Sequence, residues 1–270
     1  MSSLIIVPAR YNSSRFPGKP LALIDGVSMV VRTARNAEAA AQKIPDTIAI
    51  VATDDERIKR HCEENGILCV MTPSELPSGS DRALFAANIY SEESGKEIEF
   101  VVNLQGDAPF TPSSHILACL KTLKDDAGLE LTTPYIPLTW EALDRLRMDK
   151  KVTPFSGTTL ISNENGLAVW FSKNIIPAIR KEGALREKSS VSPVCRHIGL
   201  YAYRKAALEK FVTLPVGYWE ELEGLEQLRC LENNMRIGCV AVSPAAIAIS
   251  GIDTPEDLAR AEVILQKSKL

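Results

Sequence analysis

The chain has 270 residues, a net charge of −3, and ordinary shares of hydrophobic (45%) and charged (24%) side chains. Such a composition is typical of a globular protein that is large enough to bury a core without disulfides or metals. The slight excess of acid argues against a general nucleic-acid-binding protein, and no stretch approaches the ~20 apolar residues of a membrane span. Because the first apolar run is also too short for a signal peptide, we expect no membrane insertion and a cytoplasmic protein.

The six cysteines are scattered singly along the sequence, and no two of them form a C-x-x-C pair. A zinc site usually needs such a pair. Most of the cysteines lie within apolar patterns, where a reduced thiol behaves as a small hydrophobic side chain. We therefore expect reduced thiols and no zinc.

A buried strand is expected over Leu4–Val7, because a short run of branched apolar residues fits a parallel sheet that is covered on both faces. The prolines and glycine of Pro8–Pro20 cannot continue a strand or a helix, so a loop follows. This basic loop carries Arg10, Arg15 and Lys19. Open α/β sheets bind ligands at the carboxyl ends of their strands, and three cations there would suit a triphosphate.

Strand and helix patterns alternate after the basic loop, which is typical of a parallel α/β sheet. An Asp-Gly turn comes first, at residues 25–26. The expected elements are a helix over 27–42, a strand over 47–52, a helix over 55–65, a strand over 67–71, a helix that is capped by Ser80 or Asp81 and runs to about Ser91, and a strand over 100–104.

Two features of this half could bind phosphates. The Ser-Gly-Ser turn at 78–80 would present backbone N–H groups to an anion or a base edge, although ordinary loops often have this composition. Asp107 follows a buried strand and could hold Mg²⁺ together with substrate phosphates, or it could cap the helix that begins near Pro112. The composition of the sequence does not decide between these alternatives.

The pattern changes after Leu129. We expect strands over 129–137, 194–203 and 237–242, a hairpin formed by 160–162 and 167–171, and a helix over 219–233. The polar segment 172–192 has no clear period and would be flexible or an arm that reaches a partner subunit. Thr254 is a good N-cap for a last helix, with Pro255 at its first position and Asp257 at the capping-box position.

A second aspartate, Asp253, also follows an apolar segment and precedes a helix. If both strands lie centrally in one sheet, the carboxylates of Asp107 and Asp253 can converge. Converging carboxylates beside Arg and Lys are typical of metal-dependent nucleotidyl or phosphoryl transfer. Lys19 does not lie in a P-loop, because the glycine spacing of that motif is missing.

The basic loop is similar to the P-A-R-x-x-S-x-R-x-P-x-K loop of the acidic-sugar cytidylyltransferases, and within that family the chain resembles the members that activate 3-deoxy-manno-octulosonate (Kdo). The match runs nearly end to end, and several motifs in order are far more specific than one. The matching stretches are Ala52–Asp55, Ser78–Arg82, Asn103–Pro109, Arg196–Arg204, Leu222–Arg229 and Ile252–Leu258.

The resemblance implies one α/β domain over residues 1–270, a Rossmann-like three-layer fold of the nucleotide-diphospho-sugar transferase type with a mostly parallel central sheet. It also implies an antiparallel excursion over 129–203 that contacts the second subunit of a homodimer. The implied reaction transfers CMP from CTP to the anomeric hydroxyl of an acidic eight-carbon sugar, Kdo, for lipopolysaccharide biosynthesis, and releases diphosphate.

The resemblance also implies roles by matching position. CTP would be bound by Ala9, Arg10, Lys19, Ser78, Gly79, Arg82 and Gln105. Mg²⁺ would be bound by Asp107 and Asp253, which with Arg10 and Lys19 form the catalytic set. The sugar would be bound by Arg15, Gln105, His197, Tyr201, Glu226 and Gln227. An arginine suits the sugar carboxylate because it can bind it through two hydrogen bonds.

Several of these residues have an ordinary structural explanation. A single histidine in a strand is more often structural than a ligand, Tyr201 could lie in the core or an interface, and Glu226 and Gln227 could lie on a solvated helix face. Family members also carry a lysine and an acid where this chain has Thr159 and Asn163. The alternatives are therefore a related 2-keto sugar acid such as 8-amino-Kdo as substrate, or a non-catalytic nucleotide-sugar-binding protein.

Overall fold

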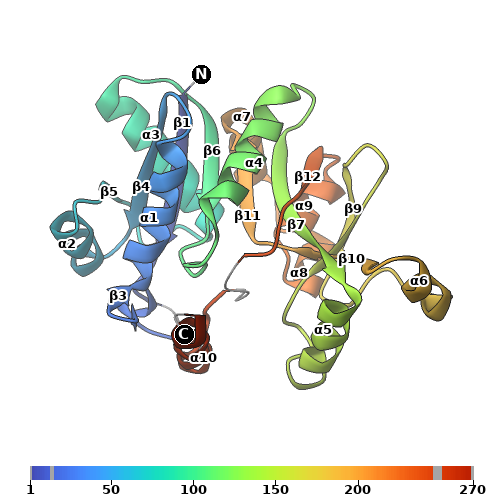
Figure 1. The fold of residues 1–270 in the computed structure, drawn as a ribbon. Helices are drawn as coiled ribbons and strands as arrows, with labels where there is room; N and C mark the ends of the chain where they lie inside the picture. The colour runs from blue at the N-terminus through green and yellow to red at the C-terminus, as the bar shows by residue number, and fades with distance from the viewer. Residues whose placement is uncertain (1, 13–14, 246–250, 269–270) are drawn as a thin grey trace.

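A ten-stranded sheet runs through the computed structural model, which describes residues 2–12, 15–245 and 251–268 (Figure 1). Ser13 and Ser14 of the basic loop lie outside the described residues. The strand order is β5-β4-β1-β6-β11-β7-β10-β8-β9, and β12 (Ile237–Ala241) pairs with β7. Helices cover both faces, so the predicted α/β class is confirmed.

The first half of the sheet is parallel. Its strands are β1 (Ser2–Ala9), β4 (Thr47–Thr53), β5 (Cys69–Met71) and β6 (Ile98–Leu104). The helices α1 (Met29–Ala41), α2 (Glu56–Glu64) and α4 (Ser113–Asp125) cover one face, and α3 (Gly79–Ser94) and α7 (Lys205–Thr213) cover the other. The prediction of alternating strands and helices is confirmed here.

Strand β1 shows why this half needs two cores. Ile5 and Val7 pack in one buried cluster with α1 and α4, whereas Leu4 and Ile6 pack in the other with α3 and α7. Successive side chains of a strand point to opposite faces, so a run of four apolar residues requires cover on both sides.

The second half of the sheet is mixed. Its strands are β7 (Leu131–Thr139), β8 (Thr159–Ser162), β9 (Ala168–Ser172), β10 (Val191–His197) and β11 (Leu200–Arg204). The antiparallel β8–β9 hairpin was predicted and is confirmed. The single strand expected over 194–203 is wrong, because the chain leaves β10 at Ile198 and Gly199 and returns as β11 on the other side of β7.

Other helical expectations also need correction. The helix predicted over 219–233 is two short helices, α8 (Tyr218–Glu223) and α9 (Gln227–Glu232), because Gly224 adopts φ 61°, a left-handed conformation that ends α8. The N-cap of helix α3 lies two or three residues earlier than expected, at Ser78 instead of Ser80 or Asp81. The helices α5 (Trp140–Val152) and α7 were not predicted.

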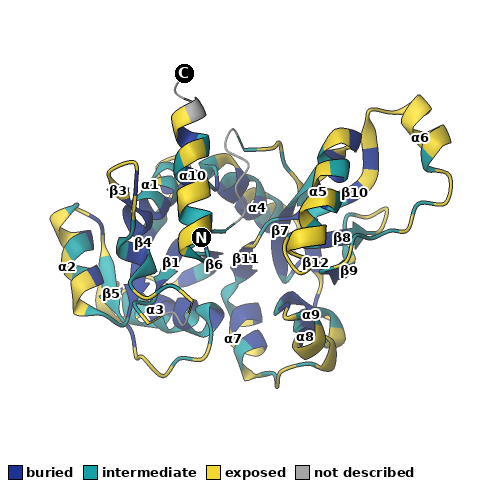
Figure 2. Ribbon diagram, turned by 90° about the horizontal axis from the view of Figure 1, so that it is seen from below, coloured by how far each residue is buried: buried dark blue, intermediate teal, exposed yellow. Residues whose placement is uncertain are grey.

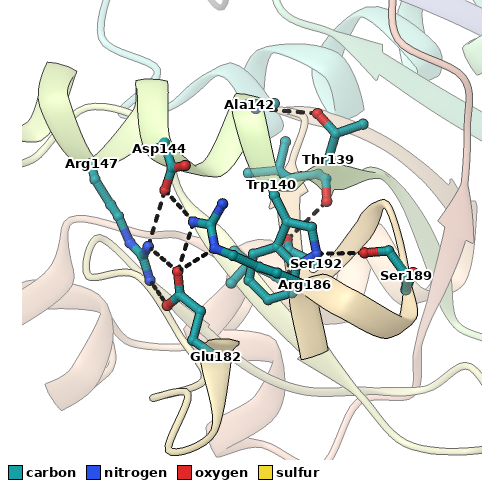
Figure 3. A network of polar contacts seen from close by, with 11 residues as sticks. Thr139, Trp140, Ala142, Asp144, Arg147, Glu182, Arg186, Ser189 and Ser192 are labelled. Atoms are coloured by element: carbon teal, nitrogen blue, oxygen red, sulfur yellow. Dashed lines mark hydrogen bonds and ion pairs between the residues drawn. The ribbon is translucent and has the colours of Figure 1, made fainter. Parts of the chain in front are cut away.

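The polar segment 172–192 contains a helix, α6 (Glu182–Lys188), which projects from the body of the molecule (Figures 1 and 2). Figure 3 shows what holds it. Glu182 accepts two hydrogen bonds from Arg147 of α5, at 2.8 and 2.7 Å, and Arg186 reaches back to Asp144 at 2.6 Å. The hydrogen bonds from Arg147 and Arg186 lower the pKa of Glu182 to about 2. The segment is thus an arm fixed to α5 by charge, which a search for apolar periodicity does not detect.

The C-terminal helix α10 (Pro255–Ser268) lies beside the segment around β3 (Val27–Ser28), at the opposite end of the molecule from the N label in Figure 1. Its predicted cap is confirmed, since the Thr254 Oγ1 accepts from the Asp257 N–H and the Asp257 carboxylate accepts from the Thr254 N–H. Residues of α10 pack on Ile24, at the end of β2 (Leu23–Ile24), which forms a small hairpin with β3. None of the described helices has the length and apolar character that crossing a membrane requires.

Candidate active site

The carboxyl ends of β1, β4 and β6 meet at one edge of the sheet because these strands are parallel neighbours. The loop that follows β6 approaches the end of β1 closely at Gly106. A Cβ atom at this position would collide with the Pro8 carbonyl oxygen, so only glycine fits. This close approach brings Asp107 to the basic loop.

Lys19 joins the two predicted metal ligands. Its Nζ donates to Asp107 Oδ2 at 3.1 Å and to Asp253 Oδ1 at 3.2 Å, and its side chain is only 15% exposed. Lys19 begins a short 3₁₀ helix, η1 (Lys19–Leu21), after Gly18 with φ 73°. The same oxygen of Asp253 lies 3.1 Å from Arg15 Nη2. The expected convergence of the two carboxylates is therefore confirmed.

The aspartates are held by backbone contacts. The Ile252 N–H donates to the Asp107 carbonyl at 2.9 Å, which links the segment before α10 to the loop after β6. The alternative role of Asp107 as a helix cap is wrong, since the N-cap of α4 is Pro112 and no side chain bonds there. The Asp107 carboxylate is thus left for Lys19 and for a ligand.

The Ser-Gly-Ser turn lies against the basic loop. Arg10 donates to the Leu76 carbonyl and, at 3.5 Å, to the Ser78 carbonyl. The expectation that this turn offers free N–H groups is wrong for Ser80 and Asp81, because both donate to Ser78 Oγ. The Ser78 side chain therefore caps these two N–H groups, and they are not available to a ligand.

Arg82 is fully buried below this turn. Its guanidinium donates to Asp54 at 3.1 Å and to the Thr72 hydroxyl, and its Nε has no partner among the described residues. Burial lowers the pKa of Arg82, while the charge of Asp54 opposes that effect. These contacts give Arg82 a structural task at the ends of β4 and β5, and its role beside CTP stays a prediction.

A polar pocket of about 300 Å³ opens at Gln105, two residues before Asp107. It contains all of the six predicted sugar contacts except Arg15. These five residues come from three separate stretches of the chain, around positions 105, 197–201 and 226–227. Its lining residues are Gln105, Gly157, Thr158, Arg196, His197, Gly199, Tyr201, Gly224, Leu225, Glu226 and Gln227.

His197 is neutral at physiological pH, because burial and then the nearby Lys173 lower its pKa to about 3. Its Nε2 lies 2.8 Å from Thr133 Oγ1. The Thr133 hydroxyl has one proton and two carbonyl acceptors, Leu200 at 2.8 Å and Ile198 at 3.3 Å, so the geometry assigns the proton of His197 to Nε2. His197 therefore keeps Nδ1 as an acceptor, which suits a sugar hydroxyl.

Tyr201, Glu226 and Gln227 line the pocket from β11 and the start of α9. Tyr201 donates to Gln227 Oε1 at 2.9 Å, and the Gln227 Nε2 has no partner among the described residues. Burial raises the pKa of Glu226, and a hydrogen bond from Ser80 opposes that rise. The explanation of Glu226 and Gln227 as a solvated helix face is therefore wrong.

The two departures from the family pattern have local explanations. Thr159 is fully buried; its hydroxyl donates to the Asn174 carbonyl at 2.7 Å and accepts from the Ile176 N–H at 3.1 Å. Asn163 accepts from the N–H groups of Asn165 and Leu167, so it closes the β8–β9 turn. Neither residue lines the polar pocket.

Two cations were missing from the predicted site. Arg196 lines the polar pocket, and burial lowers its pKa. Lys173 interacts electrostatically with Glu223, Asp253 and Arg15 and also has a pKa lowered by burial. The sequence signal for Arg196 was its place directly before His197, whereas no pattern distinguished Lys173 from other charged residues of the arm.

The fold and the site together define a nucleotidyltransferase, and comparison with known proteins gives the family. The family model described as "Cytidylyltransferase" matches residues 4–237. A curated 3-deoxy-manno-octulosonate cytidylyltransferase from Maricaulis maris is 42% identical over 267 residues, which are 98% of this chain and 97% of that protein. One from Chloroherpeton thalassium is 36% identical, with 99% of each chain covered. The chain belongs to the cytidylyltransferase family.

A solved structure is also similar. The CMP:2-keto-3-deoxy-manno-octonic acid synthetase, solved in complex with CTP, superposes with a TM-score of 0.80, at 28% identity and with 100% of both chains covered. A cytidylyltransferase from Leptospira borgpetersenii, at 14% identity and a TM-score of 0.58, shares the fold.

Proposed function

We propose that this protein transfers CMP from CTP to Kdo and releases diphosphate, which supplies the activated sugar for lipopolysaccharide biosynthesis. The observation that carries the proposal is the convergence of Lys19, Asp107 and Asp253 beside the polar pocket. The names of the full-length relatives support the same substrates.

The reaction follows from this arrangement. The anomeric hydroxyl oxygen of the sugar forms a bond to the α-phosphorus of CTP and gives up its proton to water. The bond from that phosphorus to the diphosphate oxygen breaks, and diphosphate leaves with the electron pair. Negative charge grows on the phosphate oxygens, and fixed cations that face them lower the barrier. Lys19 and Arg10 are the proposed cations, and the polar pocket would orient the sugar hydroxyls through Gln105, His197 and Glu226.

Two carboxylates that share one ammonium ion fit Mg²⁺, which prefers oxygen ligands and often takes one or two carboxylates together with substrate phosphates. We propose that Asp107 and Asp253 hold this ion when CTP is bound. Mg²⁺ would orient the phosphates and offset their charge. Lys19 would then be free to contact the phosphates.

The function is tested by measuring diphosphate release with CTP, Mg²⁺ and either Kdo, 8-amino-Kdo or another 2-keto sugar acid. Turnover with Kdo supports the proposal, and turnover with only another acid would assign a different substrate. Absence of turnover with every acid would favour the non-catalytic alternative, against which the complete set of Lys19, Asp107 and Asp253 argues.

Arg15 is expected to serve the sugar more than the nucleotide. Its side chain is 65% exposed and already lies against Asp253, at the side of the site where Lys173 also contributes charge. Arg15→Ala should raise the KM for the sugar about tenfold, the order of one charge-assisted hydrogen bond, and should change the KM for CTP much less. Steady-state kinetics with each substrate varied in turn would measure both, and an equal rise of both values would contradict this role.

We also propose a cytoplasmic homodimer. The apolar side chains that α5 and the loop after it leave exposed support a contact through the excursion, namely Met148, Val152 and Phe155. Light scattering that gives the mass of one chain at micromolar concentration would contradict the dimer.

A further inference from the structure

A single hydroxyl connects the nucleotide side of the site to the polar pocket. Ser80 lies in the first turn of α3, directly after the Ser-Gly pair assigned to CTP, and is 1% exposed. Its Oγ donates to Glu226 Oε2 at 3.0 Å, across 146 positions of the sequence. Among the residues that the structure describes, Ser80 is the only hydrogen-bond donor to this carboxylate.

The buried surroundings of Ser80 fix the direction of that bond. The Asn103 Nδ2, fully buried on β6, lies 3.4 Å from Ser80 Oγ and can only donate. The Tyr203 hydroxyl on β11 also lies beside Ser80. Because the serine hydroxyl has one proton, that proton goes to Glu226. One oxygen of the carboxylate is thereby held, the other has no hydrogen-bond donor among the described residues, and Glu226 lines the pocket.

We propose that Ser80 is a positioning residue for the sugar. It orients the Glu226 carboxylate so that its second oxygen accepts a hydrogen bond from a sugar hydroxyl, and it links this contact to the helix that begins at the nucleotide loop. The inference rests on the proposed function, because it requires Glu226 to contact the sugar acid.

The electrostatic surroundings of Glu226 predict the pH dependence. Burial raises its pKa, the charges of Glu220 on α8 and Asp81 on α3 raise it too, and Ser80 and Arg229 lower it. The neutral hydroxyls of Tyr201 and Tyr203 on β11 and the Cys230 thiol on α9 also lie near it. Loss of the Ser80 hydroxyl removes a bond to the ionised form, so the pKa of Glu226 should rise.

The test compares Ser80→Ala with Ser94→Ala, which removes an exposed hydroxyl from the far end of the same helix. Ser80→Ala should raise the sugar KM about tenfold, leave the CTP KM within about twofold, and move the acidic limb of kcat/KM for the sugar to higher pH. Ser94→Ala should match the wild type. Equal effects on both KM values, or an unmoved acidic limb, would overturn the proposal.

Two further measurements separate the positioning role from general damage to the protein, and the second of them does not require turnover. In a Glu226→Gln background, Ser80→Ala should add less than about a twofold change in sugar KM, and a full additional tenfold loss would overturn the proposal. The pKa of Glu226, followed by NMR in protein carrying ¹³C-labelled glutamate, should be higher in Ser80→Ala than in the wild type, and an unchanged value would overturn it. Wild-type turnover with Kdo tests the proposed function separately.

Discussion

Asp107→Asn and Asp253→Asn are each expected to lower kcat/KM by about 10²–10³-fold, the usual loss when one preorganised charge-stabilising group is removed from an active site. Each substitution keeps the shape of the side chain but removes the charge that Lys19 contacts and that Mg²⁺ would require. Both side chains are partly exposed, so the fold should persist. Kinetics at several Mg²⁺ concentrations measure the loss of kcat/KM, and a melting curve for each variant checks that the fold persists.

Glu256→Gln is the matched control, because Glu256 is an exposed acid in the first turn of α10 and follows Asp253 by three residues. It should keep wild-type kinetics. Wild-type activity in Asp107→Asn or Asp253→Asn, at any Mg²⁺ concentration, would remove the carboxylates from the mechanism.

Arg229→Met is expected to destabilise the fold by about 3–5 kcal/mol, the usual cost of leaving a buried charge without its partner. Arg229 donates two hydrogen bonds to Glu220, at 2.6 and 2.5 Å, and the two side chains are 11% and 8% exposed. Methionine removes the guanidinium, which lies 4.6 Å from the centre of the Phe211 ring, and leaves the Glu220 carboxylate without its cationic partner. The free energy of unfolding from urea denaturation measures this loss.

Arg145→Met is the control variant, because it breaks an exposed ion pair instead of a buried one. Arg145 pairs with Glu141 at 2.6 Å, but these side chains are 70% and 84% exposed, so water already screens the charges. This variant should unfold at nearly the wild-type urea concentration. If Arg229→Met did the same, the junction of α8 and α9, which supports Glu226 and Gln227, would not depend on the ion pair.

The parallel half of the fold was predictable from the sequence because its signals are local. The run Leu4–Val7 lies in β1, and the helix expected over 27–42 is α1, which begins two residues later because Val27 and Ser28 form β3. The cap at Thr254, outside this half, is an equally local signal and is also present. The convergence of Asp107 and Asp253 was expected from two strand ends, but only Asp107 follows a strand. Residues 251–253 have no regular secondary structure, and the bond from the Ile252 N–H to the Asp107 carbonyl brings Asp253 to the site instead.

The remaining features depend on contacts between distant residues. The arm around α6 is held by Arg147, Glu182 and Arg186, which have no apolar period. The break between β10 and β11 lets one segment pair on both sides of β7, which alternation alone cannot show. The burial of Glu226 depends on α3, 146 positions away, so its acid-rich helix suggested a solvated face instead.

The most direct test of the central claim is ³¹P NMR of the wild-type protein incubated with CTP, Kdo and Mg²⁺. We predict that the three CTP resonances will disappear together while one phosphodiester resonance, of CMP joined to the sugar, and the resonance of free diphosphate appear in equal molar amounts. Unchanged CTP with Kdo, or diphosphate released together with free CMP instead of the phosphodiester, would contradict the assignment of this site to CMP transfer onto Kdo.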